Sequence, residues 1–225
     1  MRYPLVMAFD LIIFDMDGTL VDSEPVANRV FFEKLVALGL DPHFDEATIA
    51  RDLTGLSLPS CFEHVRTHYG LTLPEDFEAI LQAETYRRLR AELNPVPGVP
   101  EMLRQVPQPK CVASSSELEK IELSLALCGL AGYFGPHCFS ARQVARGKPH
   151  PDLFLHAAKE MGYAPQVCAV VEDSLPGVTA GLRAGMTVFA YRPDPQDHQG
   201  ATFRDLGCRV FSDMAELPAL LNGGV

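Results

Sequence analysis

The sequence predicts an α/β fold in which a doubly wound parallel sheet carries a helical insert after its first strand. Three apolar runs, "LIIFDMDGT", "KCVASSS" and "VCAVVEDS", end in small polar or acidic residues, and a helix-like segment follows each run. Strands that alternate with helices are typical of a parallel sheet with helices on both faces. Residues 24–93, between the first two runs, show helical periodicity and contain no convincing strand.

The first strand is predicted at residues 11–14, an unbroken apolar run that indicates a buried strand. Proline and glycine then mark where the insert begins and ends, in "VDSEP" and in "NPVPGVPEML". We expect residues 1–22 and 95–225 to form the core and residues 23–94 to form a helical domain. Two such linkers would let this domain hinge as a lid over the strand ends.

The second and third apolar runs begin the remaining strand–helix units. Residues 117–128 place apolar side chains at helical spacing, with Ser116 as the expected N-cap. Residues 175–184 follow Ser174 with a proline in the first turn, and Gly185 stands where that helix would stop. The segments "MTVFAY" and "CRVF" are predicted as two further strands.

Length, composition and charge limit the classes of protein to which the chain can belong. Its 225 residues suit one large domain or a core with an insert, and its 47% hydrophobic and 21% charged residues are ordinary globular values. The formal net charge of −10 argues against a nucleic-acid partner, because binding a phosphate backbone needs clustered lysine and arginine. A small anionic substrate is compatible with this charge, since a local site can be positive on an acidic protein.

The cysteines and the apolar runs predict a cytoplasmic protein. The six cysteines are scattered without a CxxC pair, which favours reduced, buried thiols over a disulfide framework or a zinc site. No apolar run reaches the roughly 18 residues of a membrane span, and "MRYPLVMAFD" lacks the layout of a signal peptide. We therefore expect no membrane partner, and a monomer or weak homodimer.

Carboxylates gather at the predicted carboxyl ends of the strands, where parallel sheets bind their ligands. Asp15 and Asp17 follow the first strand, and Glu172 and Asp173 close another. Four carboxylates at one edge repel one another, and a hard divalent cation such as Mg²⁺ answers this, since it binds carboxylates, water and phosphate oxygens. One carboxylate of such a site can act as a nucleophile and its neighbour as a general acid and base.

Hydroxyl groups and a lysine complete the set with groups that suit phosphoryl oxygens. Ser114 and Ser115 close the second strand, and Lys148, in "ARGKPHPD", precedes a proline that we expect to start a helix. Hydroxyl groups, backbone amides and an ammonium group all bind phosphoryl oxygens. Alone, each serine would be a helix cap and the lysine a surface residue, so their weight comes from their place in the series.

The motifs in this order resemble those of the haloacid dehalogenase superfamily. They are "DMDGTLVDSEP" after a strand, a serine after a second strand, "GKPHP", and "EDS" after a further strand. The resemblance covers nearly the whole chain and is to the branch of small-metabolite phosphatases and β-phosphoglucomutase. It implies a Rossmann-like core, a helical cap domain and Mg²⁺. It also implies a phosphatase that acts on a small phosphorylated metabolite, a sugar phosphate or phosphorylated sugar acid, through an aspartyl-phosphate.

The resemblance also implies a role for each motif residue. Asp15 is the expected nucleophile and a metal ligand, and Asp17 is the expected general acid and base, which binds the metal through its carbonyl oxygen. Asp173 completes the metal site, and Glu172 either helps there or pairs with Lys148. Asp17 favours phosphoryl over haloalkane chemistry, because the dehalogenases of the superfamily lack this second aspartate. The residues expected to hold the phosphoryl group are Ser114, Ser115 and Lys148.

Two alternatives to a phosphatase stay open. A β-phosphoglucomutase-type phosphomutase is the rival within enzymes, but mutases of this branch carry a histidine in the first cap helix, where this chain has Ala27. A receiver-like module that stores phosphate on an aspartate is the rival from another class. The long insert and Asp17, a built-in acid and base, argue against storage.

Candidates for substrate contact in the insert are two arginines and one loop. Arg51 and Arg87 are placed to bind an anionic leaving group, although both also suit a solvated helix face. The stretch "TGLS" at residues 54–57 resembles the cap loop that reaches toward the active site in this branch. Gly55 and Ser57 are therefore further candidates.

Overall fold

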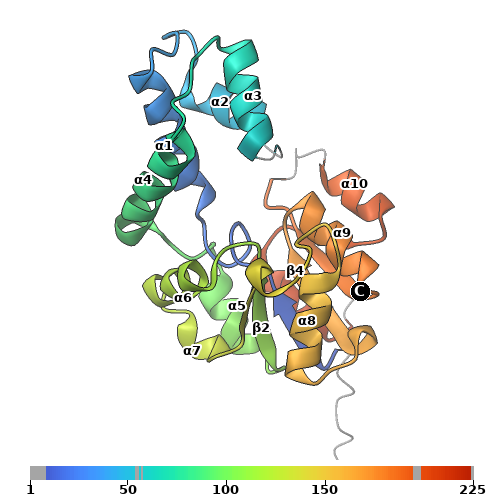
Figure 1. The fold of residues 1–225 in the computed structure, drawn as a ribbon. Coiled ribbons are helices and arrows are strands. Elements are labelled where there is room, and N and C mark those ends of the chain that lie inside the picture. Colours follow the sequence, from blue (N-terminus) through green and yellow to red (C-terminus); the bar gives the residue numbers. More distant parts are fainter. Residues whose placement is uncertain (1–8, 54–55, 57, 195–198, 224–225) are drawn as a thin grey trace, which may run out of the picture. The chain divides into compact units, whose positions relative to one another are not determined.

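The apolar run Leu11–Phe14 forms β1, a central strand of the sheet (Figure 1). The structure is a computed structural model that describes residues 9–53, 56, 58–194 and 199–223. Within these residues the sheet has six strands in the order β3-β2-β1-β4-β5-β6, and all neighbouring strands are parallel. The other strands are Lys110–Ser114 (β2), Cys138–Ser140 (β3), Cys168–Glu172 (β4), Thr187–Tyr191 (β5) and Arg209–Phe211 (β6).

Helices cover both faces of the sheet, as the unbroken apolar character of β1 predicts. Side chains alternate between faces along a strand. Leu11 and Ile13 belong to a core cluster formed with three helices that follow in the chain. On the opposite face, Phe14 meets Phe134 edge-on, with 6.0 Å between the ring centroids. The helices of the core cluster are Asp152–Met161 (α8), Leu175–Arg183 (α9) and Gln199–Asp205 (α10).

Further helices complete this part of the chain. Phe134 closes one of them, α7 (Ala131–Phe134). The others are Val99–Gln105 (α5), Leu118–Leu127 (α6) and Leu217–Leu221 (α11), with 3₁₀ helices at Ala141–Gln143, Pro165–Val167 and Met214–Glu216.

The insert is a separate helical unit with its own core. The chain divides into one compact unit of Met1–Asp22 with Asn94–Val225 and a second unit of Ser23–Leu93. Buried apolar residues of all four insert helices form one cluster, which includes Leu35, Ile49, Val65 and Phe77. No strand occurs among the described residues of the insert, so the predicted α/β class with a helical insert is confirmed. The insert helices are Glu24–Ala37 (α1), Glu46–Leu53 (α2), Leu58–His68 (α3) and Phe77–Glu92 (α4).

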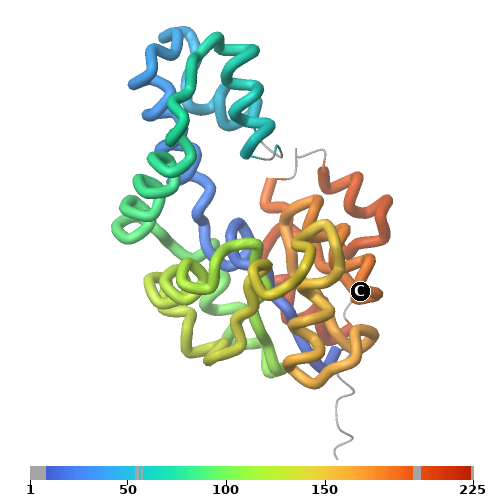
Figure 2. The backbone as a smooth tube through the Cα atoms, viewed as in Figure 1, coloured from blue at the N-terminus to red at the C-terminus, as the bar shows by residue number. Residues whose placement is uncertain are grey.

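The chain leaves the sheet unit and returns to it through two linkers that are hydrogen-bonded to each other (Figure 2). The Asp22 N–H donates to the Asn94 carbonyl at 2.9 Å, and the Val96 N–H donates to the Leu20 carbonyl at 3.0 Å. Val21 forms an antiparallel bridge with Pro95 between these bonds. Both ends of the insert are therefore tied at one place.

Two local predictions are wrong, and one strand was not predicted. Ser116 is not the N-cap of α6, because its hydroxyl group donates to Asp17 and Glu117 takes the N-cap position. The helix after Lys148 begins only at Asp152, with Pro151 rather than Pro149 next to its start. In addition, β3 was not predicted, because it contains only two apolar residues, Cys138 and Phe139. At α9 the cap is as predicted, and the Ser174 hydroxyl accepts from the Gly177 N–H at 3.2 Å.

Two predictions from composition can also be compared with the structure. All six cysteines are free in the structure, and five of them are buried, as predicted. Of the helices in the described part of the chain, none has the length and apolar character needed to cross a membrane.

Candidate active site

The carboxyl ends of β1 and β4 bring two carboxylates to one buried lysine. The ammonium group of Lys148 donates a hydrogen bond to Asp15 Oδ1 and a second one, of 2.7 Å, to Glu172 Oε1. The three side chains are 4%, 10% and 0% exposed, in the order Lys148, Asp15 and Glu172. Buried charges are tolerated only where they are paired and hydrogen-bonded. The triad of Asp15, Lys148 and Glu172 is therefore held in fixed geometry.

Burial and ion pairing shift the pKa of Asp15 in opposite directions, and the same holds for Lys148. Burial raises the pKa of Asp15 to about 7, although the Lys148 ammonium opposes the shift, and the Glu172 carboxylate adds to it. Burial alone would lower the pKa of Lys148, but its two carboxylate partners outweigh this and leave it above its ordinary value. Lys148 therefore keeps its charge at neutral pH, and Asp15 needs further positive charge to ionise fully.

Glu172 is anchored by the loop that leads into α9. Its Oε2 accepts from the Asp173 N–H at 3.0 Å and from both the N–H and the hydroxyl group of Ser174 at 2.9 Å. A Cβ added to Gly177 would lie 1.6 Å from Glu172 Oε1, so the carboxylate occupies the space that this glycine leaves. The pairing of Glu172 with Lys148 is present, and the same carboxylate also belongs to an acidic cluster with Asp15 and Asp173.

Asp173 lies against the turn that follows β1. The hydroxyl group of Thr19 donates to Asp173 Oδ1 at 2.9 Å. Gly18 has φ +80°, and a Cβ there would lie 2.4 Å from Asp173 Oδ2. Arg192, at the end of β5, donates from Nη1 to the Asp173 carbonyl at 2.9 Å. The "DGT" stretch and "EDS" therefore meet through side chains, with glycine allowing the approach.

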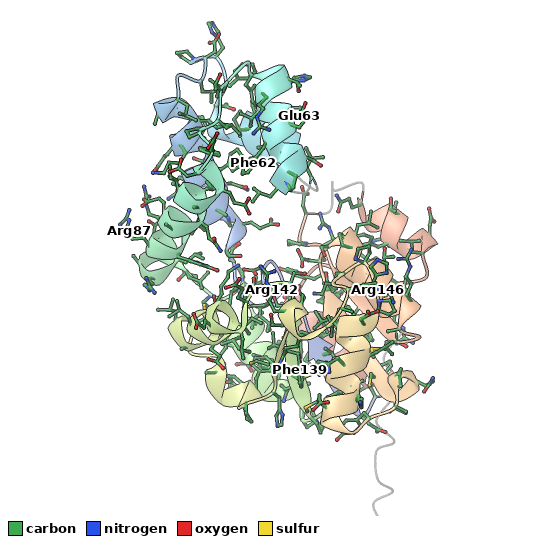
Figure 3. All side chains as sticks on the ribbon, in the orientation of Figure 1. Phe62, Glu63, Arg87, Phe139, Arg142 and Arg146 are labelled. Carbon is green, nitrogen blue, oxygen red and sulfur yellow. The ribbon has the colours of Figure 1, made fainter. Side chains whose placement is uncertain are left out.

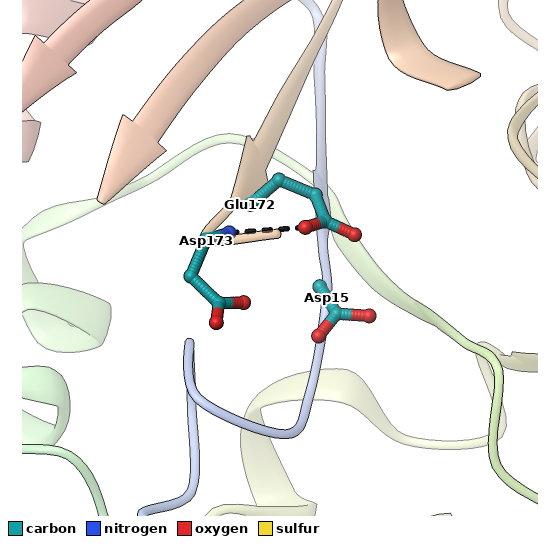
Figure 4. Close-up of side chains that lie close together, drawn as sticks. All are labelled: Asp15, Glu172 and Asp173. Atoms are coloured by element: carbon teal, nitrogen blue, oxygen red, sulfur yellow. Dashed lines mark hydrogen bonds between the residues drawn. The ribbon is translucent and has the colours of Figure 1, made fainter. Parts of the chain in front are cut away.

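The carboxylates fit a divalent cation. Asp15, Glu172 and Asp173 each offer a carboxylate oxygen, and these oxygens lie within 4.8 Å of one another (Figure 4). With Asp17 the site holds more carboxylates than the two lysines that contact them can neutralise. Oxygen donors in this number are what Mg²⁺ prefers in proteins.

Asp17 is held by groups that sequence reasoning did not assign to the site. Lys120 Nζ donates to both carboxylate oxygens of Asp17, at 3.0 and 2.9 Å, and the Ser116 hydroxyl donates to Oδ2 at 2.8 Å. Ser116 and Lys120 are four residues apart, and they also contact each other at 3.0 Å. This spacing was a usable signal, since it puts two side chains on one side of a helical turn.

The serines at the end of β2 differ in their surroundings. Ser114 is buried, and its hydroxyl oxygen accepts from the Ser116 N–H at 3.1 Å. Ser115 is exposed. Ser114 is the last residue of β2, which pairs with β1, and Ser115 comes directly after it. Both serines therefore lie at the same edge of the sheet as Asp15.

The two arginines predicted in the insert have different environments. Arg51 has a side chain that is 71% exposed, with Asp52 at 3.9 Å and a long hydrogen bond of 3.4 Å to Thr48. Arg87 on α4, labelled in Figure 3, is held by Glu84 through two hydrogen bonds of 2.6 and 2.8 Å. The loop candidates Gly55 and Ser57 lie outside the described residues.

The insert also contains a cavity of about 290 Å³. It is lined largely by apolar side chains, together with the polar residues Glu24, Asn28 and Thr85. Ala50 and Leu53 of α2 line it, on either side of Arg51 in the sequence, whereas Arg51 and Arg87 do not.

Comparison with known proteins gives a consistent result. Residues 9–185 match the family model for haloacid dehalogenase-like hydrolases. The chain is 31% identical over 216 residues to 6-phosphogluconate phosphatase of Escherichia coli (strain K12), covering 94% of each. It is 31% identical to hexitol phosphatase A of the same organism, covering 79% of this chain and 81% of that protein. A crystal structure of a HAD family hydrolase from Deinococcus radiodurans R1, with bound phosphate and sodium, is 32% identical, with a TM-score of 0.83 and 97% of each chain covered.

Proposed function

Because this chain belongs to the haloacid dehalogenase-like hydrolases, we propose that it hydrolyses a small phosphorylated metabolite with Mg²⁺ through an aspartyl-phosphate intermediate. The family predicted from the motifs is confirmed, and the chain is a phosphomonoester hydrolase. The names of the relatives, 6-phosphogluconate phosphatase and hexitol phosphatase, support a sugar phosphate or phosphorylated sugar acid as substrate. The free cysteines support a cytoplasmic location, because thiols stay reduced there.

One observation carries the proposal, the buried triad of Asp15, Lys148 and Glu172. It presents a carboxylate at the end of a buried strand beside a fixed ammonium group. A carboxylate in such a place is a nucleophile for phosphorus, and the ammonium group binds the oxygens that gain charge in the transition state. Ser114 and Ser115 are proposed to bind the same oxygens.

The reaction runs in two steps. An Asp15 oxygen attacks phosphorus and forms the aspartyl-phosphate, while the bond from phosphorus to the leaving oxygen breaks and Asp17 gives that oxygen its proton. Asp17, now a carboxylate, takes a proton from water as the water oxygen attacks phosphorus. The bond from phosphorus to Asp15 then breaks, which releases phosphate and restores both aspartates.

The carboxylates of Asp15 and Asp173 are proposed to hold Mg²⁺, with the Asp17 carbonyl, and Glu172 lies next to them. When bound, the cation would offset the repulsion between the carboxylates and the phosphoryl oxygens. The pKa of Asp15, raised by burial to about 7, would then fall and leave the nucleophile ionised.

A phosphomutase is not favoured. The relatives above carry the names of phosphatases, and Ala27 stands where the mutases of this branch are expected to carry a histidine. A receiver-like module is not favoured either, because the family is one of hydrolases.

The test is phosphate release from a panel of phosphorylated metabolites that includes 6-phosphogluconate and a hexitol phosphate. We expect turnover of at least one sugar phosphate, and we expect Asp15→Asn to lower kcat by about 10³-fold or more, as losses of a nucleophile do. Circular dichroism should show the fold unchanged. Asp10→Asn is the matched control, because Asp10 is exposed just before the same strand. Turnover by Asp15→Asn above about one percent of wild type would remove Asp15 from the mechanism.

A further inference from the structure

The Asp17 carboxylate is hydrogen-bonded by one segment, residues 116–120, in which the connection from β2 leads into the first turn of α6. Lys120, in the first turn of α6, reaches both of its oxygens, and Ser116 reaches one of them. The side chains of Lys120 and Asp17 are 19% and 28% exposed, so solvent screens this pair only in part. A carboxylate that accepts three such hydrogen bonds is confined to one orientation.

The segment of residues 116–120 is itself hydrogen-bonded to the end of β3. The hydroxyl group at the end of β3, on Ser140, donates to the Ser116 carbonyl at 2.7 Å. The same hydroxyl oxygen accepts from the Arg142 N–H at 3.2 Å, so it is held from both sides. The position of Lys120 is thereby set by the sheet and not by the surface of α6 alone.

A general acid must lie within hydrogen-bond reach of the oxygen that it protonates, so its orientation decides its rate. We propose that Lys120, assisted by Ser116, is the positioning residue that aims Asp17 at the leaving group and at the attacking water. This inference rests on the proposed role of Asp17 as acid and base. It assigns a function to a lysine outside the four motifs.

The dependence on the leaving group separates this role from a purely structural one. An alkyl leaving group needs a proton as it departs, whereas p-nitrophenolate departs with little help. If the Asp17 carboxyl group loses its orientation, hydrolysis of the alkyl phosphate therefore slows far more than that of p-nitrophenyl phosphate. A general loosening of the fold would slow both to the same extent.

The experiment compares kcat/KM for both substrates in Lys120→Met, Lys120→Arg and Lys159→Met. We expect Lys120→Met to lose about 10- to 100-fold on the alkyl phosphate, part of the 10²- to 10⁴-fold that acid catalysis supplies, and less than about threefold on p-nitrophenyl phosphate. Lys120→Arg should recover most of the loss, since it keeps the charge and the donors. Lys159, exposed in the last turn of α8, is the matched control and should change neither.

A double-mutant cycle completes the test, because residues that act through one another are not additive. Adding Lys120→Met to Asp17→Asn should cause no further loss on the alkyl phosphate. Equal losses on both substrates in Lys120→Met, or an additive further loss in the double variant, would overturn the positioning role. If Lys120→Met does not fold, Ser116→Ala takes its place with the same expected pattern.

Failure of the proposed function has a different signature. If wild type hydrolyses neither substrate, or if Asp17→Asn slows both equally, the role of Asp17 is wrong and the inference falls with it. If Asp17→Asn slows only the alkyl phosphate and Lys120→Met slows neither, the proposed function stands and the role of Lys120 is overturned.

Discussion

Gly18 and Gly177 each leave space that a carboxylate occupies. The Asp173 carboxylate lies where a side chain at Gly18 would begin, and the Glu172 carboxylate lies where one at Gly177 would begin. Gly18 also has a positive φ of 80°, which a turn requires, but Gly177 lies in helix α9 with no such constraint. At Gly177 the absence of a side chain therefore serves the site and not the backbone.

Gly177→Ala should damage both stability and activity. Its Cβ would lie 1.6 Å from Glu172 Oε1 and so would push a buried carboxylate away from Lys148. Overpacking of this kind costs about 1–3 kcal/mol, which urea unfolding would measure. Turnover of the best substrate should fall as well, because Lys148 loses one of its two anchors.

Gly132→Ala is the matched control for this substitution. Gly132 lies in α7, and a Cβ there meets no atom within 4 Å. Alanine in a helix is favoured over glycine by about 0.5–1 kcal/mol, so this variant should be as stable as wild type or more so. Equal behaviour of the two variants would mean that Glu172 adapts to the added methyl group without cost.

The sequence predicted residues of the site only where their types form a local pattern. Asp15 and Glu172 stand at the ends of apolar runs, and both lie at the Lys148 ammonium. Lys120 was not predicted, because its partner Asp17 is 103 positions away and the four-residue spacing from Ser116 does not by itself point to that partner. Thr19, 154 positions from Asp173, was likewise seen only as part of a motif. Such pairs depend on the fold that brings distant segments together.

Elements were predicted best where burial gives them a long apolar run. β1 starts and ends where its apolar run does, and β2 extends its run Cys111–Ala113 by one residue at each end, since strands covered on both faces need few polar residues. β3 was not predicted because only Cys138 and Phe139 of its three residues are apolar, and its pairing with β2 depends on the fold. The start of α8 was set too early, because proline marks the first turn of a helix only when the residues after it continue the helix.

We expect residues on the helices of the insert to decide which substrate is hydrolysed. The motif residues are proposed to bind only the phosphoryl group, so we expect the leaving group to be recognised elsewhere. Arg51 is the better candidate of the two arginines, because it is 71% exposed and weakly held, whereas Glu84 occupies Arg87. Ala50 and Leu53, close to Arg51 in the sequence, line the cavity of the insert, to which α1, α2, α3 and α4 all contribute.

Arg51→Ala should lower kcat/KM for the best natural substrate by about tenfold or more, the effect of losing a charge-assisted hydrogen bond. Hydrolysis of p-nitrophenyl phosphate should change much less. Arg66→Ala is the control, since Arg66 is also exposed on the insert with its nearest carboxylate, Glu63, at 3.9 Å. Equal losses on both substrates would make Arg51 structural, and no loss on either would direct attention to Asn28 and Glu24 in the cavity.

At the scale of the whole molecule, repulsion between the carboxylates at the sheet edge destabilises the folded chain. The chain carries a formal charge of −10, and Asp15, Glu172 and Asp173 concentrate part of this negative charge in one cluster. Like charges at short distance oppose each other's ionisation, and burial adds to this at Asp15. A divalent cation that binds only the folded site should therefore stabilise the whole sheet unit.

Mg²⁺ should accordingly raise the melting temperature as well as restore activity after treatment with EDTA. At free Mg²⁺ about 100 times its Kd, binding contributes about 2.7 kcal/mol. A domain of this size gains roughly 2–4 °C per kcal/mol, so the shift should be about 5–11 °C. Asp173→Asn should abolish both the shift and the activity, because it removes one carboxylate from the cluster. Asp205→Asn, an exposed acid at the end of α10, should keep both. Differential scanning fluorimetry in matched ionic strength measures the shift, and full activity in EDTA without any change in melting temperature would refute the metal assignment.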